Sequence, residues 1–139
     1  MSNAYIRRGP DAQQANIAAA GVAIANISAT VQPGKTGNCI IIASCGFTLG
    51  TADEQCELVI RKNGVAITNA PAATGKGHTV GDKVNTFAIR NLFLAPADVI
   101  DLFAKSSSST AEIEANGALL EVISLPPTSA FGAQLLDTP

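Results

Sequence analysis

The stretch CELVIRKNGVAIT, Cys56 to Thr68, carries the clearest strand pattern in the chain. Cys56, Leu58 and Ile60 alternate with Glu57, Val59 and Arg61, a period of two that is typical of a strand with one face against a core. The pair Asn63-Gly64 follows, and it tolerates the positive φ angles of a tight two-residue hairpin turn. The stretch therefore predicts a β-hairpin with Asn63 and Gly64 as its turn, and it offers no catalytic group.

Similar short apolar runs, separated by turn signals, continue on both sides of this hairpin. Pro33-Gly34 ends the first run, and residues 69–82, rich in Gly, Ala, Pro and Thr, are predicted to form an exposed loop. Seven or eight short strands with hardly any helix indicate an all-β, antiparallel sandwich. The predicted strands are 22–31, 38–47, 56–61, 65–68, 85–95, 96–104, 111–115 and 118–125.

Both ends of the chain lack this strand pattern. Residues 11–20 could open one short helix, and Tyr5, Ile6 and Ile17 would be costly to leave in water. We therefore weigh a floppy terminus against an arm that docks onto another subunit, and we expect removal of residues 1–20 to leave the β-domain folded. The predicted organisation is an N-terminal arm (1–21), a β-sandwich (22–126) and a C-terminal tail (127–139).

The composition favours an assembled protein. Of 139 residues, 47% are hydrophobic and only 14% are charged, which leaves little polar cover for a free monomer. A net charge of −2 without a basic stripe argues against nucleic-acid binding, and no run approaches the ~20 apolar residues of a membrane span. The first ten residues have no apolar core of a secretory signal, so we expect synthesis in a cytoplasm.

The last predicted strand is apolar on both of its faces. Leu119 and Ile123 alternate with Leu120 and Val122, and Glu121 interrupts one face. One face can meet the second sheet of the sandwich, and the other then needs a partner. We predict that Leu119, Glu121 and Ile123 lie in a subunit interface.

No reactive constellation stands out, and we predict no catalytic site, cofactor or metal. The single histidine, His78, has Asp82 four residues on, but it lies in a glycine-rich loop that would hold catalytic geometry poorly. The cysteines lack zinc spacing, and Cys39 and Cys45 are about 20 Å apart along one strand, so they cannot pair. A bridge from Cys56 to either is geometrically possible, although free thiols are expected without a secretory signal. The carboxylates of Asp53, Glu54 and Glu57 lack the spacing of a calcium loop.

Four segments, in this order, resemble the complement/tumour-necrosis-factor-like jelly roll. They are VQPGKTGNCIIIASCGF (31–47), LVIRKNG (58–64), APADVIDLFA (95–104) and ALLEVISLP (118–126), and the resemblance covers about Val22 to Pro126. Two positions depart from the family pattern. Ala97 stands where the family usually has glycine, so the turn there is expected to differ, and the tyrosine often found after the Pro-Gly turn is missing.

The resemblance implies an antiparallel jelly-roll sandwich with extended N- and C-terminal arms, assembled as a homotrimer. Domains of this kind in bacterial viruses include capsid decoration or cement proteins and fibre heads. The implied protein is a structural virion component on the capsid surface, made in the host cytoplasm, whose partner is the major capsid protein. Alternatives are a fibre or spike head that binds receptors or glycans, and a secreted complement-like binding module. The predicted capsid contacts are Tyr5, Ile6, Arg7, Arg8, Ile17 and Phe131.

Overall fold

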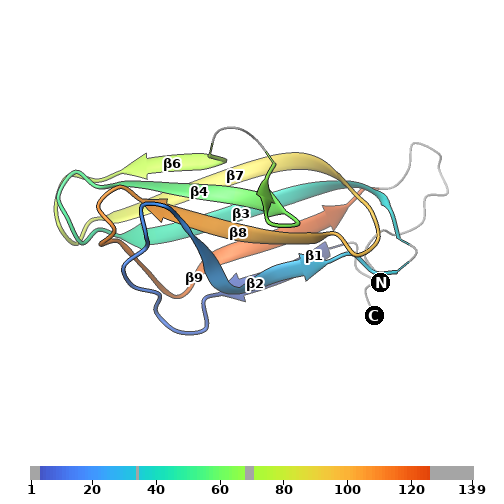
Figure 1. The fold of residues 1–139 in the computed structure, drawn as a ribbon, viewed down its shortest axis with the longest axis horizontal. Coiled ribbons are helices and arrows are strands. Elements are labelled where there is room, and N and C mark those ends of the chain that lie inside the picture. Colours follow the sequence, from blue (N-terminus) through green and yellow to red (C-terminus); the bar gives the residue numbers. More distant parts are fainter. Residues whose placement is uncertain (1–3, 34, 68–70, 126–139) are drawn as a thin grey trace.

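The computed structural model describes residues 4–33, 35–67 and 71–125, which form two antiparallel sheets packed face to face (Figure 1). Sheet A has the strand order β1 (Ala4–Gly9), β9 (Glu112–Ser124), β3 (Gly37–Thr48) and β7 (Lys83–Leu94). Sheet B has the order β2 (Val22–Thr30), β8 (Val99–Ser106), β4 (Gln55–Lys62) and β5 (Val65–Ala66), and β6 (Ala73–Lys76) also pairs with β4.

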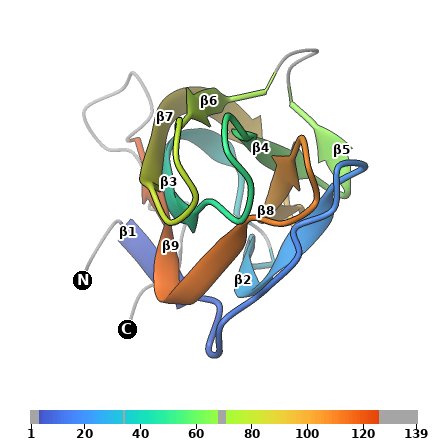
Figure 2. The same cartoon turned by 90° about the vertical axis from the view of Figure 1, so that its left-hand side faces the viewer.

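The chain crosses repeatedly between the two sheets, from β2 to β3 to β4 and later from β7 to β8 to β9. Figure 2, along the sandwich, shows the two layers curving around a common interior. This crossing pattern of antiparallel strands is that of a jelly roll. The predicted fold class is therefore confirmed.

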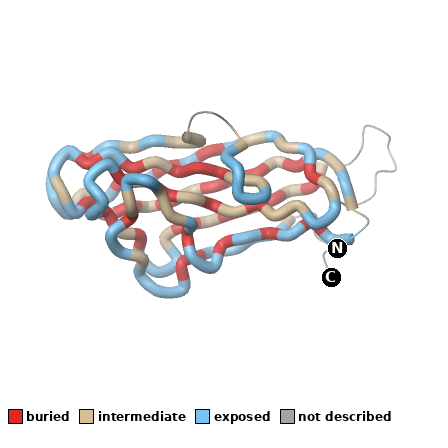
Figure 3. The backbone as a smooth tube through the Cα atoms, viewed as in Figure 1, coloured by how far each residue is buried: buried red, intermediate tan, exposed pale blue. Residues whose placement is uncertain are grey.

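The inner faces of the two sheets make one core (Figure 3). Period-two alternation gives β3 and β9 a buried side chain at every second position. Aliphatic residues dominate this core, and Phe47 is the only aromatic residue among the described core members. The fully buried large side chains include Ile41, Phe47, Leu58, Ile60, Ile100, Leu102 and Leu120.

The N-terminal region is part of the sandwich, which corrects the predicted arm. β1 pairs with β9 along its whole length, from Ala4 opposite Ile123 to Gly9 opposite Ala118. The sequence YIRR lacks the apolar alternation of a strand, because Tyr5 and Arg7, the side chains that face β2, end in polar groups. Tyr5 Oη donates to the carbonyl of Ser28 (2.9 Å), and Arg7 Nε donates to the carbonyl of Asn26 (2.8 Å).

The predicted helix after Pro10 is wrong, because residues 11–20 contain no helical segment. Gln14 forms a two-way backbone bridge with Ile113, and the Ile17 nitrogen donates to the carbonyl of Ala111 (2.9 Å). Ile17 itself is fully buried in the core. The folded unit thus begins well before Val22, and we no longer expect it to survive removal of residues 1–20.

Two further expectations need correction. The predicted loop 69–82 contains β6, where Gly75 pairs with Cys56. A side chain at Gly75 would meet Val84 Cγ1 at 2.4 Å, so this glycine marks a close approach to β7 and not a flexible loop. The two strands predicted at 111–115 and 118–125 are one strand, β9, whose pairing with β3 shifts register near Asn116, a residue with a φ of 59°.

Candidate assembly face

The outer surface of sheet A is the most distinctive functional feature among the described residues. On β9, Ala118, Leu120 and Val122 point into the core, so Leu119, Glu121 and Ile123 point out. The register forms three rows across the sheet, in which a β3 residue lies between a β9 and a β7 residue. These rows are Leu119–Ser44–Phe87, Glu121–Ile42–Ile89 and Ile123–Ile40–Asn91. All four strands of sheet A therefore contribute side chains to one surface.

This surface is mainly apolar. Ile6, Phe87, Ile89 and Phe93 expose 58%, 62%, 52% and 55% of their area, whereas side chains of this kind are usually buried. Their neighbours on β3 and β9 are half-buried. We call this surface the outer apolar face, and it consists of Ile6, Ile40, Ile42, Phe87, Ile89, Phe93, Leu119 and Ile123.

The structure brings together the three residues predicted for a subunit interface, Leu119, Glu121 and Ile123, and adds Ile6, which was predicted to contact the capsid. Five further residues of the face were not predicted from the sequence: Ile40, Ile42, Phe87, Ile89 and Phe93. The β7 sequence NTFAIRNLFLA contained a signal for this face. Phe87, Ile89 and Phe93 alternate with residues that are buried on the other side of the strand, which are Thr86, Ala88 and Leu94. A strand with large apolar residues on both of its sides indicates that both faces of the sheet are covered.

The predicted capsid contacts separate into three groups. Ile6 and Arg8 lie on the outer side of β1, opposite Glu121 and Leu119. Tyr5 and Arg7 are exposed side chains that also donate to carbonyls of β2, whereas Ile17 is fully buried in its own subunit. Phe131 lies outside the described residues.

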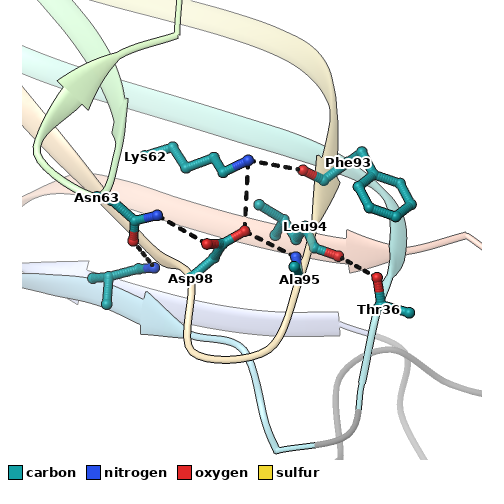
Figure 4. Close-up of polar contacts among 8 residues, drawn as sticks. Thr36, Lys62, Asn63, Phe93, Leu94, Ala95 and Asp98 are labelled. Carbon is teal, nitrogen blue, oxygen red and sulfur yellow. Dashed lines mark hydrogen bonds and ion pairs between the residues drawn. The ribbon is translucent and has the colours of Figure 1, made fainter.

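The predicted hairpin turn has a structural role (Figure 4). Asn63 and Gly64 have φ angles of 53° and 80°, as a two-residue turn of this type requires. The Asn63 amide donates to Asp98 (2.8 Å) and its oxygen accepts from the Val99 nitrogen (2.9 Å). The hairpin is thereby fastened to the turn between β7 and β8.

Asp98 organises that second turn. It accepts from the Ala95 nitrogen (2.8 Å) and lies 3.5 Å from Lys62 Nζ (Figure 4). The Ala95 N–H, the Asn63 amide and the Lys62 charge hold the pKa of Asp98 below its ordinary value. Ala97 adopts a φ of 68°, so the backbone here has the left-handed conformation that glycine would take, and the turn does not depart from it as expected. The surrounding hydrogen bonds hold the turn in that conformation.

The single histidine lies near two carboxylates in the loops at one end of the sandwich. His78 Nδ1 lies 3.2 Å from an oxygen of Asp53, and both side chains are largely exposed. Asp82 accepts instead from the backbone nitrogens of His78 and Thr79, and these bonds lower the pKa of Asp82. Within residues 4–33, 35–67 and 71–125, no hydroxyl or thiol group is hydrogen-bonded to His78.

Glu54 is a buried structural carboxylate. It accepts hydrogen bonds from Ser106 Oγ, from the nitrogens of Gly50 and Ala111 (3.2 and 3.1 Å), and from Thr110. Burial alone would raise the pKa of Glu54, but the bonds from Ser106, Thr110 and Gly50 outweigh it and lower the pKa below 4.5. The described part of the chain contains no group of three or more His, Cys, Asp or Glu that could hold a metal ion.

The three cysteines are free thiols in the core. Burial raises the pKa of Cys39 to about 11, and burial together with the Glu54 charge raises that of Cys56 to about 12. Protonated thiols of this kind pack as small apolar side chains. None of the described segments is a helix long and apolar enough to span a membrane.

Comparison with solved structures supports the fold. Eiger TNF from S. frugiperda aligns over 92% of this chain and 98% of its own, with 10% identity and a TM-score of 0.59. Murine APRIL aligns over 88% of this chain and 99% of its own, with 10% identity and a TM-score of 0.53. A chain in the structure of infectious bursal disease virus, Gx strain, aligns over 95% of this chain and 35% of its own, with 19% identity and a TM-score of 0.57.

At these identities the likeness extends to the fold alone. No protein-family model and no curated protein sequence matches the chain. The chain therefore has a jelly-roll fold similar to that of Eiger TNF and APRIL, an architecture also present in a viral protein chain.

Proposed function

We propose that this protein is a non-catalytic structural component of a virion. In this proposal it assembles as a homotrimer through the outer apolar face and decorates the head of a bacteriophage, where it binds the major capsid protein. Synthesis takes place in the host cytoplasm, and the finished trimer resides on the capsid surface.

The outer apolar face carries this proposal. Four of its side chains expose more than half of their area, and the strand register makes the eight residues contiguous. Large contiguous apolar patches on soluble proteins mark interaction sites. A second copy of the chain is the most available apolar partner, and closed cyclic symmetry lets every copy cover part of its neighbour.

The virion assignment rests on the resemblance noted in the sequence and on the fold shared with a viral chain. A fold alone does not fix a function, so it must be tested directly. A decoration protein stabilises a shell because it binds the assembled shell better than its dissociated subunits. Because Ile17 is fully buried and Ile6 belongs to the outer apolar face, we assign the capsid contact to the segment 126–139, which carries Phe131.

Co-sedimentation with empty phage heads tests this function. Wild-type protein should saturate the heads, and Phe131→Asp should lose most of this binding while remaining trimeric. Val65→Asp is the matched control, because Val65 is an exposed apolar residue on the β4–β5 hairpin of sheet B, away from the outer apolar face. Wild-type protein that fails to bind heads would contradict the decoration function, and full binding by Phe131→Asp would contradict the assigned contact.

A further inference from the structure

One carboxylate interrupts the outer apolar face. Glu121 is directly opposite Ile6 on β1 and Ile42 on β3, and Leu119 and Ile123 precede and follow it on the same side of β9. Its four nearest neighbours on the face are therefore apolar. Among the described residues, the Glu121 carboxylate has no hydrogen-bond or ion-pair partner.

Few charged groups share this side of sheet A. On β1, an edge strand, Arg8 occupies the position diagonal to Glu121, since Arg8 is opposite Leu119. On β3 the outward residues from Asn38 to Thr48 are uncharged. On β7 the only charged outward residue is Lys83, which is already paired with Glu114 of β9 and bonded to Thr48.

We propose that Glu121 makes self-association through the outer apolar face dependent on pH, so that copies associate more tightly as the pH falls. This inference rests on the proposed assembly, and its partner is a second copy of the chain. When another subunit covers the face, the Glu121 carboxylate loses water and gains no cation from its own subunit.

The direction follows from the cost of burying a charge. An unpaired carboxylate is disfavoured in an apolar environment, whereas the protonated carboxyl is tolerated there far better. The assembled state therefore binds more protons than the dissociated subunits, and lower pH favours assembly. Uptake of one proton per subunit would strengthen association about tenfold per subunit for each pH unit.

The test compares full-length wild type, Glu121→Gln and Glu57→Gln at about pH 5.5 and about pH 7.5, at one ionic strength. Glu57 is a matched control because it is half-buried in the middle of sheet B, on the opposite side of the sandwich. The dissociation constant is measured by dilution of fluorescently labelled protein. If too little protein dissociates on dilution, the rate of subunit exchange between labelled and unlabelled protein is compared instead.

Wild type and Glu57→Gln should dissociate at least about tenfold more readily at the higher pH. Glu121→Gln should associate tightly at both pH values, and its dissociation constant should change by less than about threefold between them, since glutamine carries no charge to bury. An unchanged pH dependence in Glu121→Gln would overturn the inference. Weaker association of Glu121→Gln than of wild type at the higher pH would also overturn it, because that result would mean that the carboxylate is ion-paired across the interface.

Failure of the underlying function has a different signature. If wild type and both variants are monomers at both pH values, the proposed assembly is wrong and the inference falls with it. If wild type assembles equally well at both pH values, the assembly stands and only the role of Glu121 is refuted.

Discussion

Thr110 donates two hydrogen bonds to the carboxylate of Glu54, one from its hydroxyl (3.0 Å) and one from its backbone nitrogen (3.1 Å). These residues are 56 positions apart, and the contact joins the loop before β4 to the loop before β9. Ser106, at the end of β8, donates to the same carboxylate. Glu54 thus joins the β3–β4 and β8–β9 connections at one end of the sandwich.

Replacing Glu54 by glutamine should lower the free energy of unfolding by about 2–4 kcal/mol, because the new amide group faces donors that it cannot accept from. Chemical denaturation followed by circular dichroism measures the effect. Glu57→Gln, which removes a carboxylate on the outside of sheet B, should change stability by less than about 1 kcal/mol. Equal effects of the two variants would contradict the role assigned to Glu54.

Acid should remove the contribution of the Glu54 carboxylate to the free energy of unfolding. The pKa of Glu54 is lower in the folded protein than the ordinary value of 4.5, so its stabilising contribution is complete above that value. It is lost as the pH falls from there through the folded-state pKa. Stability curves between about pH 5 and about pH 3 should therefore fall more steeply for wild type than for Glu54→Gln. Parallel curves would show that other groups dominate acid unfolding.

Ala97→Gly should stabilise the protein by about 0.5–1 kcal/mol. Ala97 has a φ of 68°, a conformation that costs an L-residue about 1–2 kcal/mol, while glycine adds a smaller entropic cost in the unfolded chain. The control is Ala23→Gly in β2, which should be destabilising because Ala23 is exposed in extended backbone. Thermal unfolding compares the two, and a lower melting temperature for Ala97→Gly would contradict the strain at this turn.

Ile17→Ala should destabilise the protein by about 2–5 kcal/mol, because Ile17 is fully buried in the core although it precedes the first predicted strand. Val65→Ala, at a side chain that is 68% exposed, should change stability by less than about 0.5 kcal/mol. Denaturant titration measures both. A negligible effect of Ile17→Ala would restore the interpretation of residues 1–21 as an arm.

The sequence predicted those parts of the fold in which apolar residues recur at period two. The strands around Cys39–Phe47 and Cys56–Arg61 and the Asn63-Gly64 turn were readable because their own residues determine them. β1 was not readable, since its inward side chains are anchored by hydrogen bonds to β2 carbonyls. The candidate face was predicted from β9 alone, because only the register shows which residues of β1, β3 and β7 share this side of sheet A.

Sedimentation equilibrium of the full-length protein at micromolar concentration tests the central claim most directly. The account predicts a mass of three subunits for wild type, and a monomer with unchanged circular dichroism for Ile89→Lys, which places a charge on the outer apolar face. Val80→Lys, at an exposed apolar residue outside this face, should remain trimeric. A folded, monodisperse wild-type monomer at these concentrations would contradict the account.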